Sequence, residues 1–334
     1  SRAALSGNYH GTSSEYVTVL EGIREEAGDD VRILYSQGCD LYKDKVENLA
    51  WDQDRISEAV ITAENSDVVI LCVGLNETLE GEEGDTGNSD ASGDKVDLHL
   101  PKVQEELIEK VTAVGKPTIV VLMAGSAIDL NYAQDNCNGI LLAWYPGARG
   151  GRAIADLLFG KESPSGKLPI TFYKDLEGMP EFTDYSMKNR TYRYMEKEAL
   201  YPFGYGLTYS DTCVTEAEVV GEVSAESDIM LKATVKNNGT VDTDEVVQVY
   251  IKDLDSPLAV RNYSLCGFKR VSLKAGEEKS VEFTISNKAM NIVDEDGNRY
   301  IAGKHFRLFA GVSQPDTRSA ELTGHKPVEI EITL

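Results

Sequence analysis

Continuous runs of apolar residues alternate with helical patterns in the first half of the chain. Three runs are apolar almost throughout, at residues 67–74, 118–123 and 139–144. Apolar side chains recur at helical spacing before, between and after these runs, at residues 56–65, 103–114 and 153–159. Strands that lack an alternating polar face are typical of parallel sheets covered by helices on both sides. We therefore predict an α/β sandwich domain over residues 1–172, with a further strand at 31–35.

The pattern changes after residue 210, where strand-like segments are separated by frequent turns. The expected strands include residues 229–235, 246–251 and 281–285, with turns at 237–239 and 274–277. Short strands with few helical stretches predict an all-β sandwich over residues 210–334. The intervening residues 173–209 are rich in Tyr, Pro and Gly and have no clear period. We interpret them as a connector that packs its aromatic side chains on both domains.

Composition narrows the possible partners. The chain has 334 residues, of which 41% are hydrophobic and 27% charged, with a net charge of −23. These values are typical of a soluble globular protein, and the negative charge argues against nucleic acid as a partner. No apolar run approaches the roughly 20 residues that span a bilayer, so no membrane partner is expected. The chain starts without Met and without a signal pattern, which suggests a fragment or processed chain. Bacterial cytoplasm and secretion both stay open.

Cysteine and histidine usage gives no sign of a cofactor. The five cysteines are odd in number and form no CxxC pair, so a disulfide framework is not expected. The four histidines are far apart and form no HExxH motif or other metal-ligand spacing. We therefore predict neither a metal nor another cofactor.

The most informative segment is the acidic loop, residues 74–85, which directly follows an expected buried strand. It contains four Glu and one Asp within nine residues. Ligand sites in α/β sheets lie at the carboxyl ends of strands. Carboxylates that repel one another and are partly desolvated have raised pKa values, as a general acid requires. A solvated loop or a calcium site would use the same residues, although the spacing does not match an EF-hand. Periodicity does not show which Glu matters.

Four ordered sequence blocks carry a resemblance to a known family. They lie at residues 98–108, at 143–172, at 191–194 with 200–209, and at 235–239 with 267–271. They include Trp-Tyr-Pro-Gly at 144–147, Ser-Gly-Lys-Leu-Pro at 165–169 and Tyr-Pro-Phe-Gly-Tyr-Gly at 201–206. With the acidic loop before them, these blocks resemble the C-terminal domains of glycoside hydrolase family 3, the β-glucosidases and β-xylosidases. The resemblance implies that the all-β sandwich is fibronectin-III-like.

The resemblance also implies a reaction and its participants. Family members are retaining β-glycosidases in which a barrel domain supplies an Asp nucleophile from a Ser-Asp-Trp motif. The loop after the Val-Gly strand supplies the general acid/base. Counted from Gly74, the matching residue is Glu80, and Glu82 and Glu83 are its rivals. Neither the barrel nor its motif is in this sequence, so the expected partners are a barrel domain or chain and a β-linked oligosaccharide or aryl glycoside. The preference between glucose and xylose is not readable.

Other features have weaker functional interpretations. Trp144 and Tyr145 end an expected strand and would stack on a sugar ring, but packing in the core or between the domains is the favoured interpretation. The glycine-rich residues 147–152 fit a tight turn better than a phosphate site, because they lack the GxGxxG and GxxxxGK[ST] patterns. Two functions outside catalysis stay open. One is a carbohydrate-binding or scaffolding module, and the other is a nucleotide-binding α/β protein.

Overall fold

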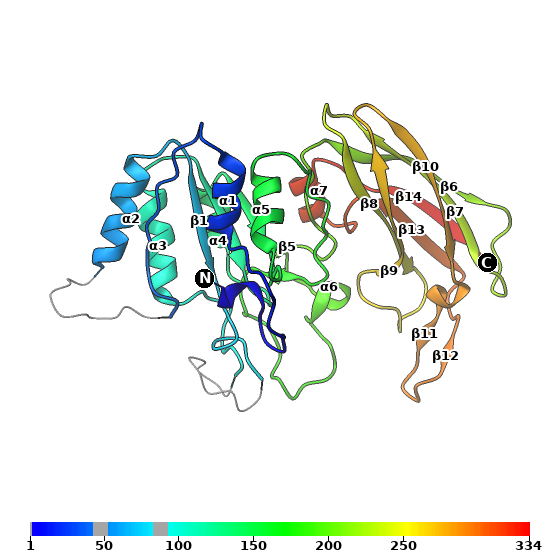
Figure 1. The fold of residues 1–334 in the computed structure, drawn as a ribbon. Helices are drawn as coiled ribbons and strands as arrows, with labels where there is room; N and C mark the ends of the chain where they lie inside the picture. The colour runs from blue at the N-terminus through cyan, green and yellow to red at the C-terminus, as the bar shows by residue number, and fades with distance from the viewer. Residues whose placement is uncertain (1, 43–52, 83–92) are drawn as a thin grey trace. The chain divides into compact units, whose positions relative to one another are not determined.

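The computed structural model describes residues 2–42, 53–82 and 93–334. The chain forms two compact units (Figure 1). Unit 1 contains Ser1–Lys161 and Lys174–Leu176, and unit 2 contains Glu162–Tyr173 and Glu177–Leu334. Each unit has its own hydrophobic core. The expected combination of an α/β domain with a β-sandwich is confirmed.

Unit 1 is built on a parallel sheet in the order β1-β2-β3. The strands are β1 (Val69–Gly74), β2 (Thr118–Met123) and β3 (Gly139–Leu142), close to the predicted apolar runs. β1 pairs with β2 in a register that places Gly74 opposite Met123, and β2 pairs with β3. The central strand β2 is almost wholly buried, which explains why its sequence is apolar on both faces.

Helices cover both faces of this sheet (Figure 1). They are η1 (Ala3–Leu5), α1 (Val19–Ala27), α2 (Asp54–Glu64), α3 (Lys102–Thr112), α4 (Asn131–Asn136) and α5 (Gly150–Leu158). Figure 1 shows α2 and α3 on one side of the sheet and α1 and α5 on the other. Val19 of α1 and Ile154 of α5 pack in one cluster with Val121 and Met123 of β2. The predicted helices at 56–65, 103–114 and 153–159 are confirmed as α2, α3 and α5.

Two features of unit 1 refine the sequence predictions. The strand expected at 31–35 is wrong, because those residues form no strand, and Val31 and Tyr35 are 47% and 58% exposed. The glycine-rich segment has a packing role in the structure. A Cβ on Gly151 would lie 2.0 Å from the Thr18 carbonyl oxygen, and one on Gly22 would lie 2.1 Å from that of Gly151. Glycine therefore allows α1 and α5 to pack closely.

Unit 2 is a β-sandwich of two antiparallel sheets, in the orders β10-β7-β6 and β14-β13-β8-β9. Its strands are β6 (Thr212–Val220), β7 (Ile229–Asn237), β8 (Thr243–Asp253), β9 (Ser264–Leu273), β10 (Glu278–Ile285), β13 (His305–Gly311) and β14 (Val328–Thr333). A short hairpin, β11 (Ile292–Val293) and β12 (Arg299–Tyr300), the turn η2 (Asn287–Met290) and α7 (Thr317–Thr323) complete the unit. Alternate residues of β7 point into the shared core, as expected for a sheet with one buried face. The three predicted strands are confirmed as β7, β8 and β10.

Residues 162–173 belong to unit 2, although the sequence pattern groups them with the α/β domain. β4 (Phe172–Tyr173) pairs with β5 (Ala199–Tyr201). Lys167 Nζ lies 2.8 Å from Glu245 Oε1, and the two side chains are only 9% and 2% exposed. The Thr212 hydroxyl donates to the other oxygen of Glu245 at 2.6 Å. This buried ion pair attaches the segment to β8.

The connector contributes aromatic side chains to unit 2. Tyr192, in the short helix α6 (Thr191–Tyr194), stacks on Phe203 with ring centroids 4.3 Å apart. It also meets Tyr250 and Tyr263 at 6.1 Å, and its hydroxyl accepts from the Leu265 N–H. The prediction that the connector packs its aromatic side chains therefore holds for Tyr192 and Phe203, whereas Phe182 and Tyr185 are 85% and 81% exposed.

Candidate functional site

The candidate site lies at the carboxyl ends of the three parallel strands of unit 1. The acidic loop begins at Gly74, whose φ is +147°. A Cβ there would lie 1.9 Å from the Met123 carbonyl oxygen, so only glycine fits. The Gln104 side chain accepts from the Gly74 N–H and donates to the Gly74 carbonyl, both at 2.8 Å. It also donates to the Leu41 carbonyl at 2.7 Å. The backbone of Gly74, where the loop begins, is therefore hydrogen-bonded at both its N–H and its carbonyl group.

A single turn then brings Glu80 back toward the sheet. The Asn76 carbonyl accepts from the N–H groups of Leu79 and Glu80 at 3.0 and 2.9 Å. The Asn76 side chain accepts from the Thr78 N–H and hydroxyl at 3.0 and 2.8 Å. Asn76 and Leu79 are buried, 9% and 7% exposed. The turn is therefore part of the packed structure of unit 1, and it sets the direction of the Glu80 side chain.

Both oxygens of the Glu80 carboxylate accept hydrogen bonds. Oε2 accepts from the Gly125 N–H at 2.7 Å and from the Tyr145 hydroxyl at 2.5 Å. Oε1 accepts from the Ser126 hydroxyl. Ser126 in turn accepts from Lys95 Nζ at 2.9 Å, and Lys95 also donates to the Ala127 carbonyl at 3.0 Å. We call Glu80, Lys95, Gly125, Ser126 and Tyr145 the Glu80 network.

Electrostatics in the Glu80 network follow from partial burial. Burial lowers the pKa of Lys95, and the charge of Glu80 opposes that shift. Burial raises the pKa of Tyr145, and the hydrogen bond and charge of Glu80 raise it further. Tyr145 therefore keeps its proton and acts as a donor to Glu80 at physiological pH. A second carboxylate, Glu77, adds to the negative field at Tyr145.

The backbone around Tyr145 fixes the ring over the network. Trp144 has a φ of +52°, in the left-handed region that bulky residues rarely adopt. The Tyr145 ring lies against two glycines, and a Cβ on Gly7 or Gly125 would come within 2.5 or 2.9 Å of it. Tyr145, expected from sequence either to stack on a sugar or to pack in the core, is half-buried and bonded to Glu80. Trp144 is also partly buried and lies beside it in sequence.

The remaining residues of the acidic loop lie past this network. The Gly81 N–H donates to the Gly93 carbonyl at 3.1 Å and closes the base of the loop. Glu82 follows directly and is exposed. Glu83, the other rival for the acid/base role, lies outside the described residues. The two glutamates thus differ: the Glu80 carboxylate is hydrogen-bonded to residues that follow β2 and β3, whereas Glu82 is exposed.

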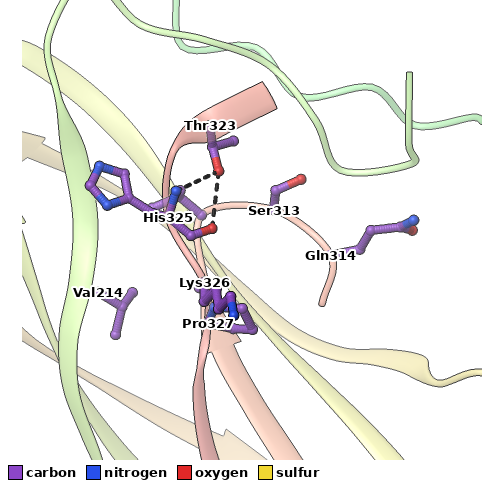
Figure 2. A pocket seen from close by; sticks show the side chains of 9 residues that line it. Val214, Ser313, Gln314, Thr323, His325, Lys326 and Pro327 are labelled. Carbon is purple, nitrogen blue, oxygen red and sulfur yellow. Dashed lines mark hydrogen bonds between the residues drawn. The ribbon is translucent and has the colours of Figure 1, made fainter. Parts of the chain in front are cut away.

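A small pocket in unit 2 offers less chemistry (Figure 2). Its lining includes Val214, Ser313, Gln314, Thr323, His325, Lys326 and Pro327. Thr323 and His325 are hydrogen-bonded to each other at the rim (Figure 2). The His325 ring is also bonded to Asp211 at 2.5 Å. These contacts give Thr323 and His325 a structural role.

Within the described ranges, no three His, Cys, Asp or Glu side chains converge as a metal site would require. In the same part of the chain, no helix is both long and apolar enough to cross a bilayer. The cysteines form no disulfide among the described residues.

Comparison with known proteins assigns the family. Residues 1–209 match the model of the glycosyl hydrolase family 3 C-terminal domain, and residues 245–314 match that of the fibronectin type III-like domain. This chain belongs to glycosyl hydrolase family 3. The resemblance drawn from the four sequence blocks is confirmed, including the fibronectin-III-like character of the second domain.

Three relatives illustrate this match, one β-xylosidase and two β-glucosidases. A β-xylosidase of Formosa agariphila is 34% identical over 327 residues, which cover 96% of this chain and 43% of the relative. A periplasmic β-glucosidase of Salmonella typhimurium is 31% identical, with 90% and 42% covered. The solved β-glucosidase of Erythrobacter marinus has a TM-score of 0.81 and 31% identity over all of this chain and 45% of its own. This family 3 chain thus spans less than half of these relatives.

Sequence reasoning found the acidic loop but missed most partners of Glu80. Ser126 and Lys95 carry no motif of their own, and Gly125 acts through its backbone. One signal was available, since Gly125 and Ser126 follow the apolar run 118–123 directly. The carboxyl ends of neighbouring parallel strands lie at one edge of the sheet, so residues after 123 and after 142 belong beside the acidic loop.

Proposed function

We propose that this chain is part of a retaining β-glycosidase that hydrolyses terminal β-linked glucose or xylose, and that its acidic loop supplies the general acid/base. The observation that carries the proposal is the position of this loop in a family 3 C-terminal domain. It follows β1 at the carboxyl edge of the parallel sheet, where α/β proteins place their ligands. The Asp nucleophile comes from a barrel domain outside this chain.

The reaction divides between the two parts. In the first step, the Asp carboxylate attacks the anomeric carbon, and a loop glutamic acid gives its proton to the departing glycosidic oxygen. This breaks the glycosidic bond and forms a covalent glycosyl-enzyme. In the second step, the same glutamate takes a proton from water, and the water oxygen displaces Asp with net retention. The two carboxyl groups stand roughly 5 Å apart in such enzymes.

The acid/base is one of three glutamates. Counting from Gly74 favours Glu80, with Glu82 and Glu83 as rivals. Two observations help to choose among them: both oxygens of Glu80 accept hydrogen bonds, and Glu82 is exposed. Trp144 and Tyr145 are proposed to lie near the sugar, with Tyr145 presenting its ring, because its hydroxyl is bonded to Glu80.

The test is hydrolysis of 4-nitrophenyl β-glucoside and β-xyloside by the chain alone and by the protein that combines it with the barrel. We expect no turnover by the chain alone and turnover by the combined protein. ¹H NMR should show the β-anomer as the first product, because two inversions retain configuration. Absence of turnover by the combined protein, together with sugar binding by the chain alone, would instead identify a carbohydrate-binding or scaffolding module.

A further inference from the structure

The hydrogen-bond directions in the Glu80 network are fixed by the donor types. Lys95 Nζ can only donate, so Ser126 Oγ accepts from it and directs its own hydrogen to Glu80 Oε1. The Gly125 N–H also has only one role, and it donates to Oε2. Tyr145 adds a second donor to Oε2. Each oxygen of Glu80 therefore receives a hydrogen from the protein itself.

A general acid needs a different arrangement. Its proton must sit on an oxygen that faces the departing group, within hydrogen-bond reach of it. Oε2 already accepts two hydrogen bonds and Oε1 accepts one, so a proton would have to occupy the remaining lone pair of Oε1, where it weakens the bond from Ser126. The donors are held firmly, because Gly125 follows β2 and Tyr145 is packed on two glycines. This geometry suits a carboxylate that holds neighbouring segments together.

The segments that Glu80 joins are those that shape the acidic loop. Glu80 belongs to the turn after β1, Gly125 and Ser126 follow β2, and Tyr145 follows β3. One residue past Glu80, the bond from the Gly81 N–H to the Gly93 carbonyl closes the base of the loop. A Cβ on Gly93 would lie 2.1 Å from the Glu82 carbonyl oxygen, so the two arms of the base pack tightly.

We infer that Glu80 is a positioning residue, which fixes the base of the acidic loop, and that proton transfer belongs to an exposed carboxyl further along the loop, which among the described residues is that of Glu82. This inference rests on the proposed function for the reaction itself. Lys95 and Tyr145 act with Glu80: Lys95 orients Ser126, and Tyr145 ties β3 to the loop. Their joint effect is to hold Glu82 in one place relative to the sheet.

The first test needs no activity. In hydrogen–deuterium exchange on the full chain, Glu80→Gln and Tyr145→Phe should speed exchange at the Gly81 and Gly125 amides by about tenfold or more, because opening of the loop base limits that exchange. Glu82→Gln and the control Glu109→Gln, on the exposed side of α3, should leave both amides unchanged. Unchanged exchange in Glu80→Gln would overturn the positioning role.

The second test measures kcat/KM in the protein that combines this chain with the barrel, using aryl glycosides with good and poor leaving groups. Glu82→Gln should lose about 10²–10⁴-fold only on poor leaving groups, and azide should rescue the second step with good ones. Glu80→Gln should lose a similar factor on both, on the order of 10–100-fold, without azide rescue. Tyr145→Phe should act in the same uniform way and add little to Glu80→Gln.

The outcomes separate the two proposals. Leaving-group-dependent loss and azide rescue in Glu80→Gln would make Glu80 the acid/base and overturn the inference, while the proposed function would stand. No turnover by the unmodified combined protein would remove the proposed function, while the exchange test would still judge the positioning role. If Glu80→Gln fails to fold, Tyr145→Phe decides: a uniform loss supports the inference and a leaving-group-dependent loss contradicts it.

Discussion

Replacing Lys167 by Met should destabilise unit 2 strongly. The Glu245 side chain is 2% exposed in the unmodified chain. Without Lys167, its hydrogen-bond donors among the described residues are the Thr212 hydroxyl and the Val246 N–H, each at 2.6 Å. Removing one partner of a buried ion pair costs about 3–5 kcal/mol, because the other charge stays buried and uncompensated. At roughly 2–4 °C per kcal/mol for a domain of this size, the melting temperature of unit 2 should fall by roughly 6–20 °C.

The two units can be followed separately in one sample. Unit 2 contains no tryptophan and Trp144 belongs to unit 1, so the fluorescence of Trp144 reports the unfolding of unit 1. Far-UV circular dichroism and calorimetry report the unfolding of both units, so a transition that they show and fluorescence does not is that of unit 2. Lys167→Met should shift the unit 2 transition and leave the fluorescence transition in place.

Two further variants complete the experiment. The double variant Lys167→Met with Glu245→Leu should recover most of the loss, because no buried charge then remains. The control Lys274→Met breaks an exposed pair with Asp242, also at 2.8 Å, and should leave the melting temperature unchanged. A loss below about 1 kcal/mol in Lys167→Met, or no recovery in the double variant, would refute the reasoning.

Two other predictions concern the fold. Gly74→Ala should destabilise unit 1 by more than about 2 kcal/mol, because the added Cβ would meet the Met123 carbonyl. Urea unfolding should show this loss. The control Gly11→Ala, where a Cβ would lie in open space, should leave the stability unchanged. Burial, helped by Asp316, raises the pKa of Tyr263, so its hydroxyl stays protonated in the folded state where the unfolded chain loses the proton. The stability that this shift contributes is complete below about pH 10 and is lost progressively as the pH rises above it. In thermal scans, the melting temperature of Tyr263→Phe should therefore fall less steeply with alkaline pH than that of the unmodified chain. An equally steep fall would contradict this.

The sequence predicted elements whose residues face one environment. β2 is buried on both faces and reads as an unbroken apolar run, so its bounds were predicted correctly. The strand at 31–35 failed because Val31 and Tyr35 are exposed, and an apolar run alone does not show whether a neighbouring strand is there to pair with it. The placement of 162–173 depends on Lys167 meeting Glu245, which is 78 residues further along the chain and gives no local pattern.

In the candidate site, too, local features could be predicted and long-range contacts could not. The acidic loop is a local feature, visible as carboxylates after an apolar strand. The hydrogen bonds that distinguish Glu80 from Glu82 come from Gly125, Ser126 and Tyr145, 45, 46 and 65 residues away. The predicted parallel sheet places the residues after 123 and after 142 at the same edge as the acidic loop, but the sequence pattern does not show which of them contact Glu80.

The most direct test of the central claim is to replace Glu80, Glu82 and Glu83 by Gln together, in the protein that joins this chain to its barrel. The account predicts that hydrolysis of β-glycosides with poor leaving groups falls at least about 100-fold, because none of the three candidate glutamates then remains to donate a proton. Full activity of this triple variant on such substrates would contradict the claim that the acidic loop supplies the general acid/base.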